Sequence, residues 1–231
     1  MRNRVWLVTG ASRGIGAEIA KAVLATGDTL IAAARTPSTL AFLGSSDRLL
    51  PVRLDVTDSA QAADAVAAGI ERFGQIDILV NNAGISFLGA VEETSADHVK
   101  RLFETNVFGL LNVTRAVLPH MRGRRRGHIV NIASVAGYSG YAGFGVYSGT
   151  KFAVEGLSEA LHLELAPLGV NVTIVEPGFF RTDILDHATS LVEADIRFAD
   201  YDATAGAVRE FVPQINRNQP GDSVKLAYAL I

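Results

Sequence analysis

Tyr147 and Lys151 lie four residues apart in the stretch Tyr147-Ser148-Gly149-Thr150-Lys151, thirteen residues after Ser134. Side chains at positions i and i+4 project from the same face of a helix. An ammonium beside a phenol favours the phenolate and so lowers the pKa of the phenol. A tyrosine that loses its proton more easily can act as a general acid or base for an alcohol or a carbonyl. We therefore expect this pair to be reactive and the pKa of Tyr147 to be lowered.

Alternating strands and helices must position this pair. Continuous apolar runs predict six buried strands, at residues 5–9, 29–34, 50–54, 76–80, 129–133 and 170–175. Helical patterns fall between them, over about 58–73, 95–121 (with a break near Thr105) and 147–165, and later over 204–216 and 222–231. Runs that do not alternate indicate strands buried on both faces, joined by right-handed crossovers. The sequence thus predicts an α/β fold, a doubly wound parallel sheet (Rossmann-like) with helices on both faces, as one domain over residues 1–231.

Such sheets bind ligands beyond the carboxyl ends of their strands, and the polar motifs fall at those ends. The first is a glycine-rich loop, with Gly10, Gly14 and Gly16 between a strand and a helix. Glycines allow a sharp turn and close approach to a pyrophosphate, and the helix N-terminus offers free N–H groups. The spacing differs from the usual G-x-G-x-x-G pattern. Taken alone, it fits an ordinary turn equally well.

The end of the second strand bears on the choice of cofactor. Dinucleotide folds often carry an acid there that binds the adenosine ribose. Here the position is Ala33 or Ala34, followed by Arg35, so no carboxylate repels a 2′-phosphate. Arg35 and Arg13 can supply guanidinium donors to a phosphate. The sequence therefore favours NADP(H) over NAD(H), although both arginines could also be solvated loop residues.

Composition and charge narrow the function classes. With 231 residues, 48% of them hydrophobic, the chain can form one large core. The net charge of −3 gives no electrostatic case for nucleic acid. There is no cysteine and no paired histidine spacing, so we predict no metal site. No signal-like segment or membrane span is visible, which leads us to expect a cytoplasmic protein. The basic run 122–126 is interpreted as a solvated loop rather than a polyanion site.

Several motifs together resemble the short-chain dehydrogenase/reductase family, in its compact single-domain form. They are Thr9-Gly10-Ala11-Ser12-Arg13-Gly14-Ile15-Gly16, Asn81-Asn82-Ala83-Gly84, Ser134, Tyr147-x-x-x-Lys151 and Pro177-Gly178. The resemblance spans about residues 5–183. Residues 178–183 are similar to the subgroup with 17β-hydroxysteroid- and retinol-dehydrogenase-like enzymes. Family members usually carry a further strand after the last helix, and none is visible before Ile231.

The resemblance implies roles for particular residues. Tyr147 would be the catalytic acid/base, Lys151 its partner on the nicotinamide ribose, and Ser134 a hydrogen-bond donor to the substrate oxygen. Asn106 would hold a water that links Lys151 to solvent. With the two arginines, the expected cofactor contacts are Gly10, Ser12, Arg13, Gly14, Ile15, Gly16, Arg35, Asp55, Val56, Asn82, Ala83, Gly84, Tyr147, Lys151, Pro177, Gly178 and Thr182.

Aromatic and apolar residues around these motifs predict an apolar substrate pocket. They are Tyr138, Tyr141, Phe144, Val146, Phe179 and Phe180. We expect a hydrophobic ketone, aldehyde or secondary alcohol as substrate, with residues 179–220 as a loop region that closes over it. Apolar helix faces near 108–111 and 152–165 are consistent with a homodimer or homotetramer. Two alternatives remain: a non-catalytic NADP-binding sensor or scaffold, and an isomerase or dehydratase of nucleotide sugars. The second would require a larger C-terminal domain than this chain contains.

Overall fold

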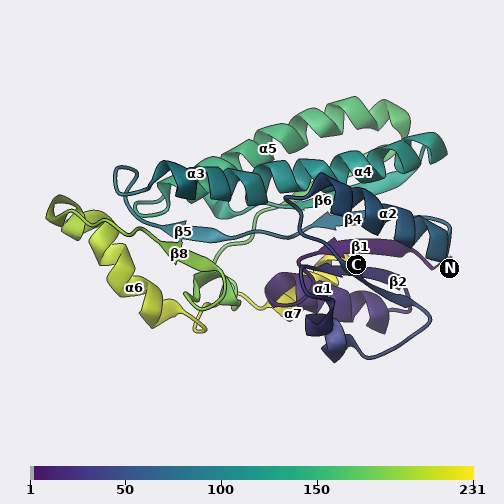
Figure 1. Cartoon of the computed structure of the whole chain (residues 1–231), viewed down its shortest axis with the longest axis horizontal. Coiled ribbons are helices and arrows are strands. Elements are labelled where there is room, and N and C mark those ends of the chain that lie inside the picture. The colour runs from purple at the N-terminus through teal and green to yellow at the C-terminus, as the bar shows by residue number, and fades with distance from the viewer. Residues whose placement is uncertain (1–2) are drawn as a thin grey trace.

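The computed structural model describes residues 3–231, and its centre is a parallel sheet of six strands (Figure 1). In chain order these strands are β1 (Val5–Thr9), β2 (Thr29–Ala34), β3 (Leu49–Arg53), β4 (Ile78–Asn81), β6 (Gly127–Ile132) and β7 (Val170–Val175). Their spatial order is β3-β2-β1-β4-β6-β7, and every pairing is parallel. The chain reverses its direction of travel across the sheet between β1 and β4. This confirms the predicted doubly wound fold and marks the β1–β4 border as the place for a ligand.

Helices cover both faces of the sheet, as expected. On one face α2 (Ser59–Phe73), α4 (Gly109–Arg124) and α5 (Gly145–Leu165) lie above the strands in Figure 1, and on the other α1 (Gly14–Ala25) lies beside α7 (Ser223–Leu230). Local sequence sets their ends. The Asp58 carboxylate accepts hydrogen bonds from the first backbone N–H groups of α2, and Gly74 ends that helix with a positive φ.

The buried strands explain the continuous apolar runs. Successive side chains of a strand point to opposite faces. In β1, Leu7 packs into the core under α2 and α4, whereas Trp6 and Val8 pack into the core under α1. All three are essentially inaccessible to solvent. Because both faces are covered, an alternating polar pattern has no place in these strands.

The break predicted near Thr105 is a π-helical turn. The helix α3 (Ala96–Phe103) runs into the π-turn Glu104–Phe108, which leads directly into α4. A π-turn inserts an extra residue into the helix and is often found at functional sites. Here it carries the buried Asn106 toward the segment that follows β4.

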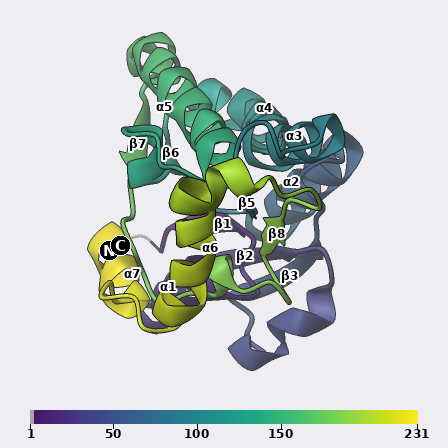
Figure 2. The same cartoon turned by 90° about the vertical axis from the view of Figure 1, so that its left-hand side faces the viewer.

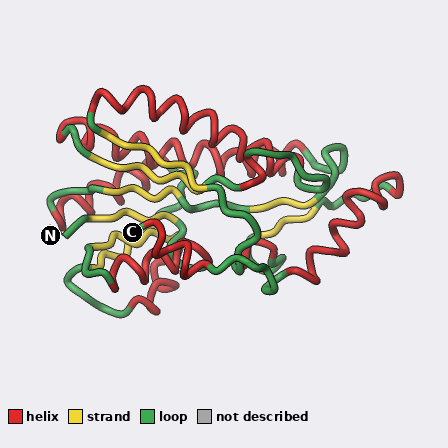
Figure 3. The backbone as a smooth tube through the Cα atoms, turned by 180° about the vertical axis from the view of Figure 1, so that it is seen from behind, coloured by secondary structure: helices red, strands yellow, loops and turns green. Residues whose placement is uncertain are grey.

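A second, smaller layer lies beyond the carboxyl ends of the six strands. It consists of β5 (Ser86–Leu88), paired in parallel with β8 (Leu191–Glu193), and α6 (Ala207–Ile215), which crosses the open end of the molecule in Figure 2. Figure 3 shows the two short strands continuing outward from the main sheet. The helix expected over 204–216 is confirmed, although its first part is a π-turn at Asp202–Gly206. The β5–β8 pairing was not predicted.

Two further details differ from the expectations. The fourth strand begins at Ile78 rather than residue 76, since the Asp77 carboxylate accepts the N–H of Val5. The basic run is only partly solvated, because Arg124 forms an ion pair with Asp77 at 3.0 Å and Arg125 donates to the carbonyl of Pro167. Within residues 3–231, none of the helices combines the length and apolar character needed to cross a bilayer.

Candidate functional site

A cavity of about 1110 Å³ opens at the carboxyl ends of the strands, at the border between β1 and β4. The glycine-rich loop, the ends of β2, β4 and β6, the start of α5 and the segment after β7 all contribute to its wall. Of the residues expected in the site, only Gly16 and Asn106 do not line it. Across the described residues, no group of His, Asp and Glu side chains is arranged to hold a metal ion.

The glycine-rich loop is held in shape by the residues after β4. Gly10 and Gly14 have φ values of +64° and +54°, which favour glycine. The Asn82 amide donates to the carbonyls of Thr9 (3.0 Å) and Gly10 (3.2 Å). A Cβ on Gly16 would collide with the Gly10 carbonyl and the Asn82 amide. Gly16 thus allows close packing behind the loop. The Asn82 amide is occupied by the loop backbone.

The far end of the cavity lacks an acid on β2. This strand ends at Ala34, and the exposed Arg35 follows it on the cavity wall. Asp55 also lines the cavity, and its carboxylate accepts hydrogen bonds from the N–H and hydroxyl of Thr57. Arg13 donates to the carbonyl of Thr189 at 2.9 Å, which ties the glycine-rich loop to the segment before β8.

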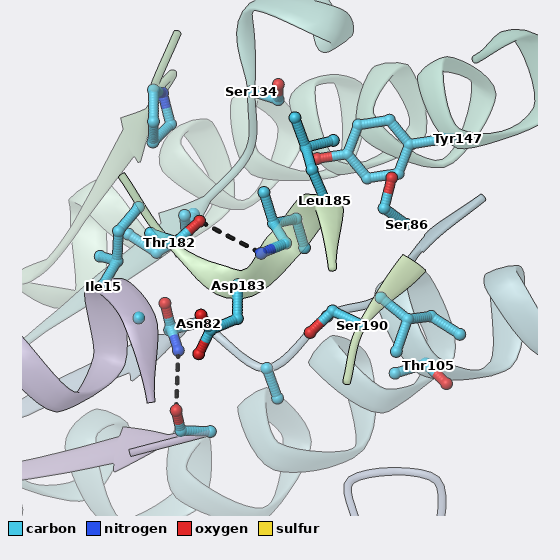
Figure 4. Close-up of a pocket in the computed structure, with 18 of the residues that line it drawn as sticks. Ile15, Asn82, Ser86, Thr105, Ser134, Tyr147, Thr182, Asp183, Leu185 and Ser190 are labelled. Carbon is cyan, nitrogen blue, oxygen red and sulfur yellow. Dashed lines mark hydrogen bonds between the residues drawn. The ribbon is translucent and has the colours of Figure 1, made fainter. Parts of the chain in front are cut away.

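Ser134, Tyr147 and Lys151 meet at one wall of the cavity. Ser134 follows β6 and caps the short 3-10 turn Val135–Gly137, accepting the N–H of Ala136 at 3.1 Å. Tyr147 and Lys151 lie in the first turns of α5, with the ammonium 5.7 Å from the centre of the phenol ring. Figure 4 shows the Tyr147 hydroxyl directed into the cavity, on the side where Ser134 lies. The spacing read from the sequence therefore does bring the three side chains together.

The expected direction of the Tyr147 pKa is wrong in this structure. Burial raises the pKa of Tyr147 to about 12, and the Ser134 hydroxyl offsets only part of that rise. Burial likewise lowers the pKa of Lys151 to about 8, although Glu155 opposes this. The ammonium donates to the carbonyl of Ile132 at 2.9 Å. Because both groups are withdrawn from water, desolvation outweighs their mutual effect, and Tyr147 stays protonated at neutral pH.

Asn106 lies behind this wall. Its side-chain oxygen accepts the N–H of Ile85 at 2.9 Å, and its amide donates to the Ile85 carbonyl and to the Thr150 hydroxyl. The Thr150 hydroxyl in turn donates to the Tyr147 carbonyl at 2.7 Å. Asn106 therefore joins the segment after β4 to the first turn of α5.

The apolar part of the cavity differs from the prediction in two residues. Tyr141, Phe144, Phe179 and Phe180 line it as expected. Tyr138 does not, because it is 82% exposed, and Val146 packs instead against the cluster around Phe87. The sequence analysis missed the contributions of α6 and of two buried serines, namely Val208, Phe211, Val212, Ile215, Ser86 and Ser190. The amphipathic pattern of residues 207–215 was the available signal for α6.

Comparison with known proteins places this site in a family. The family model described as short chain dehydrogenase matches residues 4–193. Oxidoreductase BOA17 from Botryotinia fuckeliana is 39% identical over 227 residues, which are 97% of this chain and 82% of that protein. 3-Ketodihydrosphingosine reductase from Bacteroides thetaiotaomicron is 40% identical over 187 residues, covering 81% of this chain and 68% of that protein.

Solved structures agree with the fold. A short-chain dehydrogenase from Streptomyces avermitilis superposes with a TM-score of 0.90 at 44% identity, covering 99% of this chain and 82% of that chain. A short chain dehydrogenase/reductase from Burkholderia phymatum in complex with NAD gives 0.84 at 31% identity (98% and 83%), and ElxO with NADP bound gives 0.81 at 27% identity (99% and 90%). Since the family model spans most of the chain and its relatives share the fold over nearly all of it, the chain belongs to the short-chain dehydrogenase/reductase family of oxidoreductases.

Proposed function

We propose that this protein is an NADP(H)-dependent oxidoreductase that interconverts a hydrophobic ketone or aldehyde and its alcohol. One observation carries the proposal: Ser134, Tyr147 and Lys151 line the same cavity as the glycine-rich loop. A phenol and an ammonium on a helix are common surface features. Facing the phosphate-binding end of a Rossmann-like sheet, they are placed to act on a substrate beside a nicotinamide.

The residues present fit a dinucleotide. The turn at Gly10 and Gly14 leaves no Cβ between the backbone and a pyrophosphate, at the N-terminus of α1. Asp55 and Val56 line the region that would hold the adenine, and Pro177, Gly178 and Thr182 line the region that would hold the nicotinamide. Ser12, Ile15, Ala83 and Gly84 complete the proposed contacts. Asn82 and Gly16 would act from behind, by keeping the loop in shape.

The preference for NADP(H) rests on the end of β2. The related structures include both an NAD and an NADP complex, so the family alone does not decide it. In this chain Ala34 offers no carboxylate to the ribose, and Arg35 lies exposed beside that position. We expect NADPH to bind more tightly than NADH, and Arg35→Ala to weaken NADPH binding selectively. Equal affinity of the wild-type protein for both cofactors, measured by fluorescence titration, would contradict this preference.

The bound nicotinamide would supply the hydride for reduction or accept it during oxidation. Tyr147, protonated because of its raised pKa, donates its proton to the carbonyl oxygen in the reductive direction. Ser134 offers its hydroxyl to the same oxygen. Lys151 binds the nicotinamide ribose and holds positive charge near the phenol. Asn106 and Thr150 fix the first turn of α5, and so the position of the Tyr147 ring.

The walls near Tyr147 support a hydrophobic substrate. Apolar side chains from α6 and from the segments around Phe144 and Phe179 enclose this part of the cavity, and Ser86 and Ser190 are its buried polar residues beside β5 and β8. A substrate of the 17β-hydroxysteroid or retinol kind fits these walls. We further propose a homodimer or homotetramer, for which α4 and α5 expose Phe108, Phe152 and Leu163.

A screen of NADPH consumption over hydrophobic ketones and aldehydes tests the proposal. Tyr147→Phe should retain NADPH binding and lose most turnover, because it removes only the transferable proton. Tyr138→Phe is the matched control, since Tyr138 is exposed and outside the cavity. Undiminished turnover in Tyr147→Phe would remove Tyr147 from this role. Tight NADPH binding without turnover of any carbonyl would favour the sensor or scaffold alternative.

A further inference from the structure

Gln219 is a buried polar residue in the cavity wall that the proposed mechanism does not use. It lies in the connection from α6 to α7 and is 1% exposed. Its backbone is firmly placed: Arg181 donates from its guanidinium to the Gln219 carbonyl at 3.0 Å. Two residues later, Gly221 pairs with Phe180 in a parallel bridge, with hydrogen bonds of 3.0 and 2.8 Å. This pairing holds Gln219 beside the segment that follows Pro177 and Gly178.

The side-chain amide of Gln219 has no hydrogen-bond partner within residues 3–231. Both its oxygen and its nitrogen are buried, and both lack a partner. Exchanging the two atoms by rotating the amide leaves the same two groups unpaired, so the result does not depend on that assignment. An unpaired buried donor or acceptor is costly, and native proteins almost always satisfy such groups. A ligand that enters the cavity can supply the missing partners.

We propose that Gln219 binds the carboxamide of the nicotinamide, an inference that rests on the proposed cofactor. A primary amide presents a donor beside an acceptor, and its full complement is a second primary amide, with one hydrogen bond in each direction. A phosphate or a ketone could satisfy the donor of Gln219 but would leave its oxygen unpaired. The place also agrees, because Gln219 lines the cavity with Gly178 and Thr182, which border the proposed nicotinamide position. Gln219 would therefore be a cofactor-binding residue.

Cofactor analogues test this contact in the whole protein. The probes are NADP⁺, its 3-acetylpyridine analogue, in which a methyl ketone replaces the carboxamide, and 2′-phospho-ADP-ribose, which lacks the ring. We expect the wild-type protein to bind NADP⁺ about tenfold more tightly than the analogue, as the loss of one or two hydrogen bonds predicts. In Gln219→Leu this preference should fall to near one, with the affinity for 2′-phospho-ADP-ribose unchanged. Gln214→Leu, on the exposed face of α6, is the matched control.

The stability of the ligand-free protein separates this role from a structural one. Because the Gln219 amide has no partner in the protein, Gln219→Leu should melt no lower than the wild type without ligand, and should gain less on adding NADP⁺. A lower melting temperature without ligand, or an unchanged preference for NADP⁺ over the analogue, would overturn the inference. Failure of the wild-type protein to bind any of the three probes would instead remove the proposed cofactor.

Discussion

Replacing Lys151 by methionine should abolish activity and, at neutral pH, stabilise the folded protein. Lys151 is 8% exposed, and burial lowers its pKa from 10.5 to about 8. Below pH 8 the folded protein therefore holds an ammonium in a site that disfavours the charge. Methionine keeps most of the side-chain length and carries no charge. The variant removes the burial penalty together with the hydrogen bond to the Ile132 carbonyl.

The size of the effect follows from the pKa of Lys151. The difference between 10.5 and about 8 corresponds to a penalty of about 3 kcal/mol at pH 7. Losing the hydrogen bond to Ile132 costs about 1 kcal/mol, which leaves a net gain of about 2 kcal/mol for Lys151→Met. Between pH 8 and 10.5 the unfolded chain binds more protons than the folded one. For this group, stability of the wild type thus rises with pH, and about 1.5 kcal/mol of the penalty remains at pH 9.5.

Urea unfolding of the two proteins at pH 7 and pH 9.5 measures this difference. The advantage of Lys151→Met should shrink by about 2 kcal/mol between the two pH values. Lys225→Met is the control, because Lys225 is exposed on α7 and carries no burial penalty. A Lys151→Met variant that is less stable than the wild type at pH 7, or a difference that does not change with pH, would refute the reasoning.

Three other outcomes are expected. Arg209→Met should lower the free energy of unfolding by about 3–5 kcal/mol in urea, because it leaves the Glu93 carboxylate buried without its ion pair. Burial raises the pKa of Glu93, but hydrogen bonds from Arg209 and two backbone N–H groups hold it at about 2, so the wild type should lose this contribution as pH falls from about 4.5 to 2. Gly16→Ala should abolish NADPH binding in a fluorescence titration, since its Cβ would meet the Gly10 carbonyl, and retained affinity would count against the loop as the phosphate site. Alcohol oxidation should rise about tenfold per pH unit between pH 6 and 9, because the pKa of Tyr147 is about 12 and the phenolate fraction grows in proportion; a flat profile would contradict that value.

The strands, the order of the helices and the motifs at the sheet edge could be predicted from the sequence. Leu7 and Val8 show why: in a sheet covered on both faces, every position of a strand is apolar, and the run itself marks the element. The pairing of β5 with β8 could not be predicted. Each strand has three residues, and more than a hundred residues of chain lie between Ser86 and Leu191, so no local pattern indicates that they meet.

The candidate site was predictable in its residues and not in its electrostatics. The i, i+4 spacing of Tyr147 and Lys151 places both side chains on the cavity wall. Whether the ammonium lowers the pKa of the phenol depends on how deeply both groups are buried, and burial is a property of the whole fold. Likewise Tyr138 and Tyr141 are equivalent in the sequence, yet only the second faces the cavity, because the 3-10 turn at Val135–Gly137 sends Tyr138 into solvent.

The buried polar groups of this molecule fall into two kinds, and the difference separates support from function. Glu93 and Arg209 are buried and paired, and the pKa of Glu93 is held low because the folded protein satisfies its charge. Lys151 and Gln219 are buried at the cavity, one with a lowered pKa and one with an amide that lacks a partner. Removing a paired group should weaken the fold, whereas removing either of these two should not. Free energy left unsatisfied in the fold is free energy that a ligand in the cavity can recover, so unfolding experiments on the ligand-free protein can identify binding residues before any substrate is known.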